Sequence, residues 1–167
     1  MINIGIVGNR NFKDVELGFD LVENWIEKLV IVKKSYKIHS GEAKSKHKGN
    51  VDQRAKKKAI EIGLEYIPHE PRLNDNMTQK ERNDEFKRRN GELAKVVKIL
   101  ICFINKGQWH SGTFNTINQF TKLGKWDFLI FNQWGKIWEY KDLPKWLRDR
   151  ILKYHIEYPI LIEDLRF

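Results

Sequence analysis

The chain has very little cysteine. Cys102 is the single cysteine among 167 residues, so the protein cannot form an internal disulfide. It lies within the most apolar run of the sequence, where a thiol behaves as a small hydrophobic group. We therefore expect Cys102 to be a buried core residue, and we expect no structural zinc site.

Long apolar runs are also missing. None approaches the roughly 18 residues that a membrane-spanning helix needs. The first residues, Met1 to Ile4, lack the basic and apolar regions of a secretory signal. The sequence contains no repeat, linker or low-complexity segment either. We expect a cytoplasmic protein without a membrane partner, long enough for one domain with a hydrophobic core.

Acidic residues are outnumbered by basic ones. The 31 Lys and Arg residues against 22 Asp and Glu residues give a formal charge of +9, with a pI near 9.6. This balance favours anionic partners such as nucleic acid, nucleotides or acidic lipid headgroups. A composition rich in Lys, Ile and Glu is equally typical of proteins from hot habitats. Both interpretations of this basic protein, nucleic-acid binding and a thermophile origin, stay open.

Strand and helix patterns alternate along most of the chain. Apolar runs predict strands over residues 2–7, 36–39, 64–67, 99–104 and 127–131. Apolar residues at steps of three and four predict helices between them, over residues 15–29 after an Asp14 cap, 50–62, 78–96 and 114–123. This alternation implies right-handed crossovers. We predict a three-layer, Rossmann-like α/β fold with a mainly parallel sheet and helices on both faces.

The pattern changes beyond Asn132. Residues 136–140 read as a short strand, a helix opens near Pro144, and residues 158–162 read as a last strand. Spacing within that helix predicts that Leu147, Ile151 and Tyr154 point inward. We therefore divide the chain into residues 1–131 and a short α/β extension, residues 132–167, packed on the same domain.

Glycine and polar residues gather in the loops that follow the predicted strands. Ligands of open parallel sheets bind at the carboxyl ends of the strands, so a site is expected there. The fourth loop runs into a helix, whose first N–H groups and dipole suit a phosphate or carboxylate. The candidate binding residues in these loops are Gly8, Asn9, Arg10, Ser40, Gly41, Glu42, Gly107, Ser111, Gly112 and Thr113.

Several of these residues also have purely structural interpretations. Gly8 suits a tight turn, and Gly41 suits a positive φ. A guanidinium at a strand end can clamp a phosphate, but Arg10 fits a surface ion pair equally well. Asp52, near a helix start, can simply favour the helix dipole.

Metal and acyl-transfer chemistry find no support in the sequence. The four histidines in or near the loops show no ligand spacing with a carboxylate, and no Gly-x-Ser-x-Gly elbow is present. We expect no metal site and no cofactor. The histidines concerned are His39, His47, His69 and His110.

Four short motifs follow one another along the chain. They are Gly-Asn-Arg-Asn-Phe at 8–12, Ser-Gly-x-Ala at 40–43 with later Gly49 and Asp52, Arg-Asn at 89–90, and Ser-Gly-Thr at 111–113. Together they resemble the SLOG superfamily, which consists of Rossmann-like domains related to the Lonely Guy phosphoribohydrolases and to the core of DNA-processing protein A. The likeness covers residues 2–131 and is greatest to small uncharacterised nucleotide-binding members. It implies a nucleotide pocket lined by Gly8, Arg10, Gly41, Arg89, Asn90, Ser111, Gly112 and Thr113, and leaves a homodimer open.

The sequence departs from the family pattern at two places. Residues 44–48 lengthen the second loop, which changes the spacing to Gly49 and Asp52. The Lonely Guy motif Pro-Gly-Gly-x-Gly-Thr-x-x-Glu ends in a glutamate that assists N-glycosidic cleavage, and Thr116 stands at that position here. A threonine cannot activate water as a carboxylate does. Hydrolysis by that mechanism is therefore disfavoured.

Three functions remain open. The leading one is binding of a nucleotide or nucleotide-derived ligand through phosphate-cradling loops, with Arg89 and Asn90 contributing unless they form a solvated helix face. The second is an N-glycosidic or phosphate-bond hydrolase that uses Glu42, Asp52 or Glu70 as its carboxylate. The third is single-stranded DNA or other nucleic-acid binding through basic residues at 44–58 and 87–89 together with Trp126, Trp134, Trp138 and Trp146.

Overall fold

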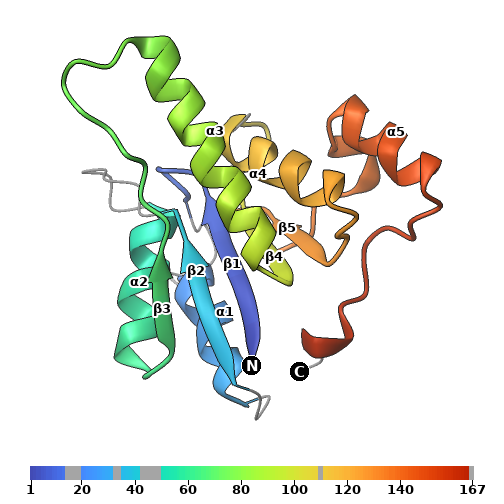
Figure 1. The fold of residues 1–167 in the computed structure, drawn as a ribbon. Coiled ribbons are helices and arrows are strands. Elements are labelled where there is room, and N and C mark those ends of the chain that lie inside the picture. Colours follow the sequence, from blue (N-terminus) through green and yellow to red (C-terminus); the bar gives the residue numbers. More distant parts are fainter. Residues whose placement is uncertain (14–19, 32–34, 42–49, 109–110, 166–167) are drawn as a thin grey trace.

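The computed structural model describes residues 1–13, 20–31, 35–41, 50–108 and 111–165 (Figure 1). Five strands form one sheet in the order β3-β2-β1-β4-β5, and every neighbouring pair is parallel. The connections run outward from β1 to β3 and then from β4 to β5, so the strand order reverses between β1 and β4. The strands are β1 (Ile2–Gly8), β2 (Tyr36–Ser40), β3 (Glu65–Pro68), β4 (Ile99–Phe103) and β5 (Phe128–Phe131).

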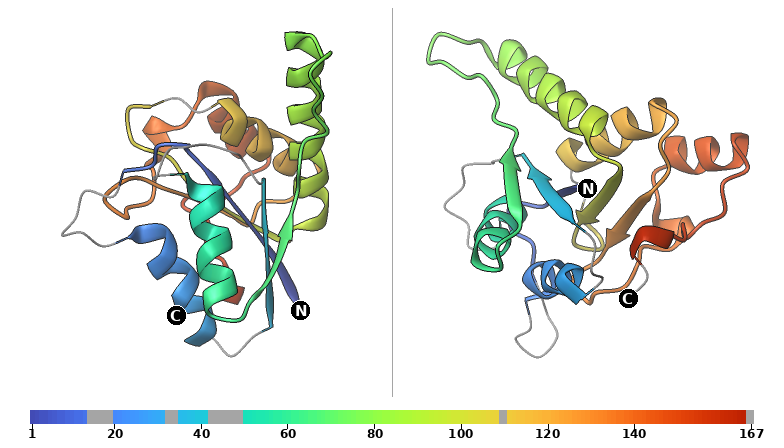
Figure 2. Two further views of the ribbon diagram at one scale, coloured as in Figure 1. Left: turned by 90° about the vertical axis from the view of Figure 1, so that its left-hand side faces the viewer. Right: turned by 60° about the horizontal axis from the view of Figure 1, so that its bottom comes forward.

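Helices cover both faces of the sheet (Figure 2). One layer holds α1 (Leu21–Ile31) and α2 (Val51–Glu61), and the other holds α3 (Gln79–Val96) and α4 (Ser111–Lys122). The last helix, α5 (Lys145–Lys153), packs in the second layer. The predicted three-layer α/β fold is confirmed. None of the helices in the described residues has the length and apolar character needed to cross a bilayer.

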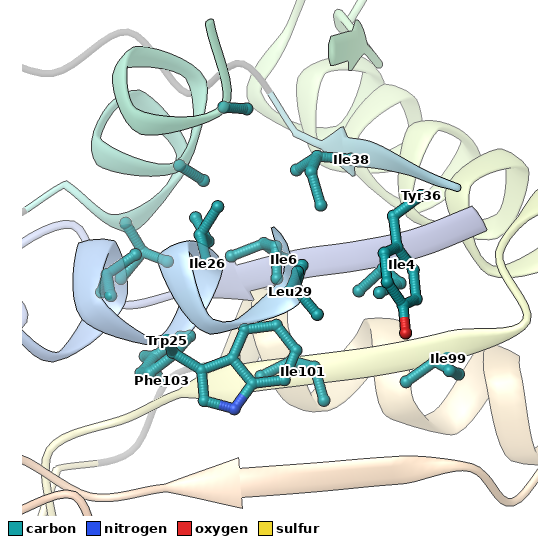
Figure 3. Close-up of a cluster of buried hydrophobic side chains, with 14 of the residues drawn as sticks. Ile4, Ile6, Trp25, Ile26, Leu29, Tyr36, Ile38, Ile99, Ile101 and Phe103 are labelled. Atoms are coloured by element: carbon teal, nitrogen blue, oxygen red, sulfur yellow. The ribbon is translucent and has the colours of Figure 1, made fainter. Parts of the chain in front are cut away.

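Alternating side chains of the central strands supply the two cores. Ile99, Ile101 and Phe103 of β4 pack against α1 and α2, in the cluster drawn in Figure 3. Leu100 and Cys102 point to the opposite face, toward α3 and α4. The prediction for Cys102 is confirmed, since the residue is fully buried and its burial raises the pKa of the thiol.

Local signals fix several helix ends as predicted. Asn50 accepts a hydrogen bond from Gln53 N at 3.3 Å and begins α2, while Thr78 and Glu81 form the expected capping box of α3. The carboxyl end of α3 is fixed by a residue of the connection between α4 and β5. Lys125 Nζ donates to the carbonyl oxygens of Ala94, Lys95 and Val97 at 2.9, 2.6 and 2.8 Å. The predicted cap Asp14 lies outside the described residues, but the predicted helix start at residue 15 was wrong for α1, which begins at Leu21 after the non-helical Asp20.

The two strands predicted in the carboxyl-terminal residues are not formed. Residues 136–140 contribute only an isolated bridge between Phe131 and Ile137, and residues 158–162 form no strand. Pro159 lacks an N–H group for a ladder there, and the neighbouring Tyr158 and Ile160 pack against the core instead. The helix after Pro144 is present as α5, but its Tyr154 is exposed rather than inward.

Helix α4 begins earlier than predicted. Ser111, Gly112 and Thr113 form its first turn, and Phe114 is its fourth residue. The predicted apolar face is buried at Phe114, but Leu123 lies beyond the end of the helix and is 48% exposed. The Ser-Gly-Thr motif therefore belongs to a helix N-terminus and not to the preceding loop.

Candidate functional site

A cavity of about 730 Å³ opens at the carboxyl ends of the central strands, where the strand order reverses. Its volume lies in the range of small-molecule sites, about 300–1,000 Å³. It is bounded by the ends of β1 and β2, the starts of α2 and α4, and the face of α3 from Gln79 to Leu93. The lining residues include Val7, Gly8, Arg10, Gly41, Asp52, Gln79, Asn83, Phe86, Lys87, Arg89, Asn90, Leu93, Ser111, Gly112, Thr113, Asn115 and Thr116.

Most of the predicted site residues meet in this cavity. They come from four segments far apart in the sequence, so the fold has to assemble them. Arg10, which follows β1, and Thr113, in the first turn of α4, line the same space. The predicted residues that line the cavity are Gly8, Arg10, Gly41, Arg89, Asn90, Ser111, Gly112 and Thr113.

Four predicted residues are not placed in the cavity lining. Asn9 is buried and donates from Nδ2 to Gln108 Oε1 at 3.4 Å, which joins two loops. Ser40 is also buried, and Gly107 is exposed in the loop before α4 with a φ of 83°. Glu42 lies outside the described residues. Ser40 nevertheless contacts the lining, since its Oγ lies 2.9 Å from Asp52 Oδ1.

Arg89 is the central charged group of the cavity. Its guanidinium donates to the carbonyl oxygen of Gly41 and stacks over the Phe86 ring, 5.6 Å from the centroid. Its buried Nε has no acceptor among the residues that the structure describes. Burial lowers the pKa of Arg89, the Asp52 carboxylate opposes this shift, and Arg10 adds to it by like-charge repulsion. The charge of a bound anion would offset both the cost of this burial and the repulsion from Arg10.

Gly41 is required by the close approach of Arg89. A Cβ built on Gly41 would lie 3.0 Å from Arg89 Cζ and 3.0 Å from Asp52 Oδ2. Its φ is not positive, so the conformational interpretation of this glycine was wrong. The residue leaves the space in which the guanidinium reaches the backbone.

Asp52 is the acidic member of the site. It lies in the first turn of α2, lines the cavity, and accepts a hydrogen bond from Ser40 Oγ at 2.9 Å. Ser40 Oγ also lies 2.8 Å from Ile6 O, so its one proton is shared between the carboxylate and the β1 carbonyl, and the hydroxyl links the two. Glu70 is exposed and does not line the cavity. Within the described ranges, Asp52 is the one carboxylate in the lining.

The N-terminus of α4 is held against α3. Asn90 Nδ2 donates to Gly112 O at 3.3 Å and to Asn115 Oδ1 at 3.2 Å. Thr116 is buried and donates from Oγ1 to Gly112 O at 3.1 Å. These contacts direct the first turn of α4, with its N–H groups and the positive end of its dipole, toward the cavity.

The outer half of α3 was missed as part of the site. Gln79, Asn83, Phe86 and Lys87 line the cavity from a part of the helix that rises beyond the strands (Figure 1). Their spacing of four, three and one places them on one helical face that continues to Asn90. That spacing was the available signal, but a mostly polar helix face more often faces solvent.

Two histidines form a pair next to Arg89. His39 Nδ1 and His69 Nε2 lie 2.9 Å apart. Burial, followed by the proximity of His69 and Lys37, lowers the pKa of His39 from 6.5 to about 4, and burial also lowers the pKa of His69. The described residues contain no group of three metal-ligating side chains. His47 and His110 lie outside them.

The pair predicts a pH dependence of stability. The unfolded chain binds a proton at His39 below pH 6.5, whereas the folded chain does so only near pH 4. Stability from neutral His39 is therefore complete above pH 6.5 and falls as the pH drops toward 4, by at most about 1.4 kcal/mol per pH unit. Urea unfolding of wild type and His39→Leu from pH 4 to 7 should show a shallower slope for the variant.

Substitution of a second histidine controls for effects on acid stability that do not depend on the His39 site. His155 is exposed, so His155→Asn should keep the wild-type slope. Equal slopes for wild type and His39→Leu would contradict the prediction.

The four tryptophans named with nucleic acid differ in burial. Trp138 is a core residue whose indole N–H donates to Ile104 O at 3.1 Å. Trp126 and Trp146 are half-buried against the second core cluster, and Trp134 is 39% exposed. Residues 44–49 of the basic run lie outside the described residues.

Comparison with models of protein families and with curated proteins gives no match. The functional argument therefore depends on the geometry and charge of the cavity.

Proposed function

We propose that the protein binds a nucleotide or nucleotide-derived ligand, with a phosphate at the N-terminus of α4 between Arg10 and Arg89. The observation that carries this proposal is the half-buried Arg89 guanidinium, whose buried Nε has no acceptor among the described residues and which lies near a second cation, Arg10. A buried, unsatisfied donor is unfavourable until a ligand pairs with it. A phosphate oxygen is a suitable acceptor.

The surroundings of Arg89 support an anionic ligand. Arg10, Lys87 and Arg89 line the cavity against Asp52 alone within the described part of the chain, so the local charge is positive. The first turn of α4 adds N–H donors and the hydroxyl groups of Ser111 and Thr113. Gly112 has no side chain to obstruct a ligand at this turn.

Calorimetric titration tests the proposal directly. The purified protein is titrated with nucleoside 5′-monophosphates, nucleoside diphosphates, cyclic nucleotides and ADP-ribose at two salt concentrations. We expect at least one to bind with micromolar affinity that weakens as salt rises. Absence of binding by all of these ligands, at low salt and with folded protein, would overturn the proposal.

A second candidate function is hydrolysis of the N-glycosidic bond of the bound nucleotide. The position of Asp52 in the cavity is the observation that favours it, since a carboxylate can activate water. Chromatography of free base released from nucleoside monophosphates, with wild type and Asp52→Asn, tests this function. Release by wild type that the variant lacks would establish hydrolysis.

Binding without release of base would support a binding protein. We expect that result, because the Asp52 carboxylate already lies in hydrogen-bond contact with Ser40 and beside Arg89, so the protein's own groups engage it.

A further inference from the structure

The cavity has two chemically different ends. At the inner end, Asn90 contacts Gly112 at the start of α4, so this residue marks the place where the phosphate is proposed to bind. An α-helix rises about 1.5 Å per residue, which places Phe86 about 6 Å and Asn83 about 10 Å farther out along α3. These distances are close to those between a 5′-phosphate and the base of the same nucleotide.

Phe86 supplies a flat apolar surface at that position. It is half-buried and lines the cavity, and the Arg89 guanidinium lies over its ring with the Cζ atom 5.6 Å from the centroid. Phe86 is the one aromatic residue in the lining as far as the chain is described. Stacking on an aromatic ring beside a guanidinium is a common way to hold a nucleobase.

Amide groups lie beyond the ring. Gln79 Nε2 donates to Asn83 Oδ1 at 2.9 Å, which fixes the two exposed side chains relative to each other. Both residues are exposed and line the cavity, and their mutual hydrogen bond does not use the Asn83 amino group or the Gln79 carbonyl oxygen. Together they offer a donor and an acceptor, as the polar edge of a base requires.

We propose that the outer half of α3 is a nucleobase subsite, in which Phe86 stacks on the base and Asn83 and Gln79 contact its polar edge. The subsite depends on the proposed function, because it presumes a phosphate at the inner end. It narrows the ligand class to nucleoside phosphates and excludes sugar phosphates and inorganic phosphate as preferred ligands.

The test compares ligands with and without a base. AMP, GMP, CMP and UMP are titrated beside ribose 5-phosphate into wild type, Phe86→Leu and Phe86→Tyr. Leucine keeps apolar contact beneath Arg89 but removes the aromatic face, whereas tyrosine keeps both. We expect the best nucleotide to bind wild type at least tenfold more tightly than ribose 5-phosphate does. Phe86→Leu should weaken binding of that nucleotide by about tenfold and leave the affinity for ribose 5-phosphate unchanged. Phe86→Tyr should stay within about threefold of wild type.

The outcomes separate the two proposals. Equal binding of nucleotides and ribose 5-phosphate, or an equal loss of both in Phe86→Leu, would overturn the base subsite and keep the phosphate site. Failure of every ligand to bind folded wild type would overturn both. Thermal unfolding of each variant establishes that it is folded. Asn83→Ala is a second test of the base subsite, because it should weaken binding of the nucleotide and leave binding of ribose 5-phosphate unchanged.

Discussion

Replacing Arg89 by methionine should weaken nucleotide binding by about a hundredfold. The substitution keeps much of the side-chain volume and the contact with Phe86 but removes the half-buried charge and its donors, among them the buried Nε. Loss of one partner of a buried, charged hydrogen-bonded pair costs about 2–5 kcal/mol, and a hundredfold change in Kd corresponds to about 2.7 kcal/mol. Calorimetric titration with the best nucleotide measures the change.

Two further variants make the Arg89 prediction specific. Arg89→Lys keeps the charge but lacks the planar fork, so an intermediate loss of about tenfold is expected. Arg82 lies on the same helix outside the cavity lining and donates to Asn74 O at 3.0 Å, so Arg82→Met should leave binding unchanged. Equal losses in Arg82→Met and Arg89→Met would mean that net charge, and not the site, governs affinity.

Replacing Gly8 by alanine should destabilise the protein by about 3–4 kcal/mol. A Cβ at this position would lie 2.8 Å from Val51 Cγ2 and closer still to the carbonyl oxygen of Phe103. Neither group can move away easily, since Val51 is fully buried at the start of α2 and Phe103 is paired with Gly8 in the sheet. We expect the midpoint of thermal unfolding to fall by roughly 10 °C.

Gly91 provides a matched control for the Gly8 substitution. It lies in α3, and a Cβ built on it meets no atom within 4 Å. Gly91→Ala should therefore stabilise the protein by about 0.5–1 kcal/mol through helix propensity. The same chemical change is thus expected to have opposite signs at the two positions. A small effect at Gly8 would show that the backbone there can relax and that the close packing between β1 and β4 is not required.

The sequence predicts the parallel sheet and its helices because their signals are local. Uninterrupted apolar runs such as residues 99–104 fit strands covered on both faces, and capping residues such as Thr78 satisfy the first N–H groups of a helix directly. At the carboxyl-terminal tail these signals fail. The apolar residues Tyr158 and Ile160 are partly buried by packing against the core of the assembled layers, which requires no strand neighbour.

The candidate site was predictable where it depends on the ends of strands. Gly8, Gly41 and Thr113 follow or face strand ends, and parallel strands bring such positions to one edge. Phe86 and Asn83 were not predictable in this way. Their place in the cavity depends on how far α3 extends past the sheet, which is a property of the assembled layers and not of the local pattern.

The anchoring of α3 by Lys125 has a consequence for how ligand preference can change. The inner end of the helix is fixed to the body of the protein by three hydrogen bonds, and its outer half carries few core residues. Residues near position 83 can therefore be exchanged, or a helical turn added or removed, without disturbing the parallel sheet. A set of variants confined to that half of α3 offers a practical route to redesigning which small molecules the protein selects.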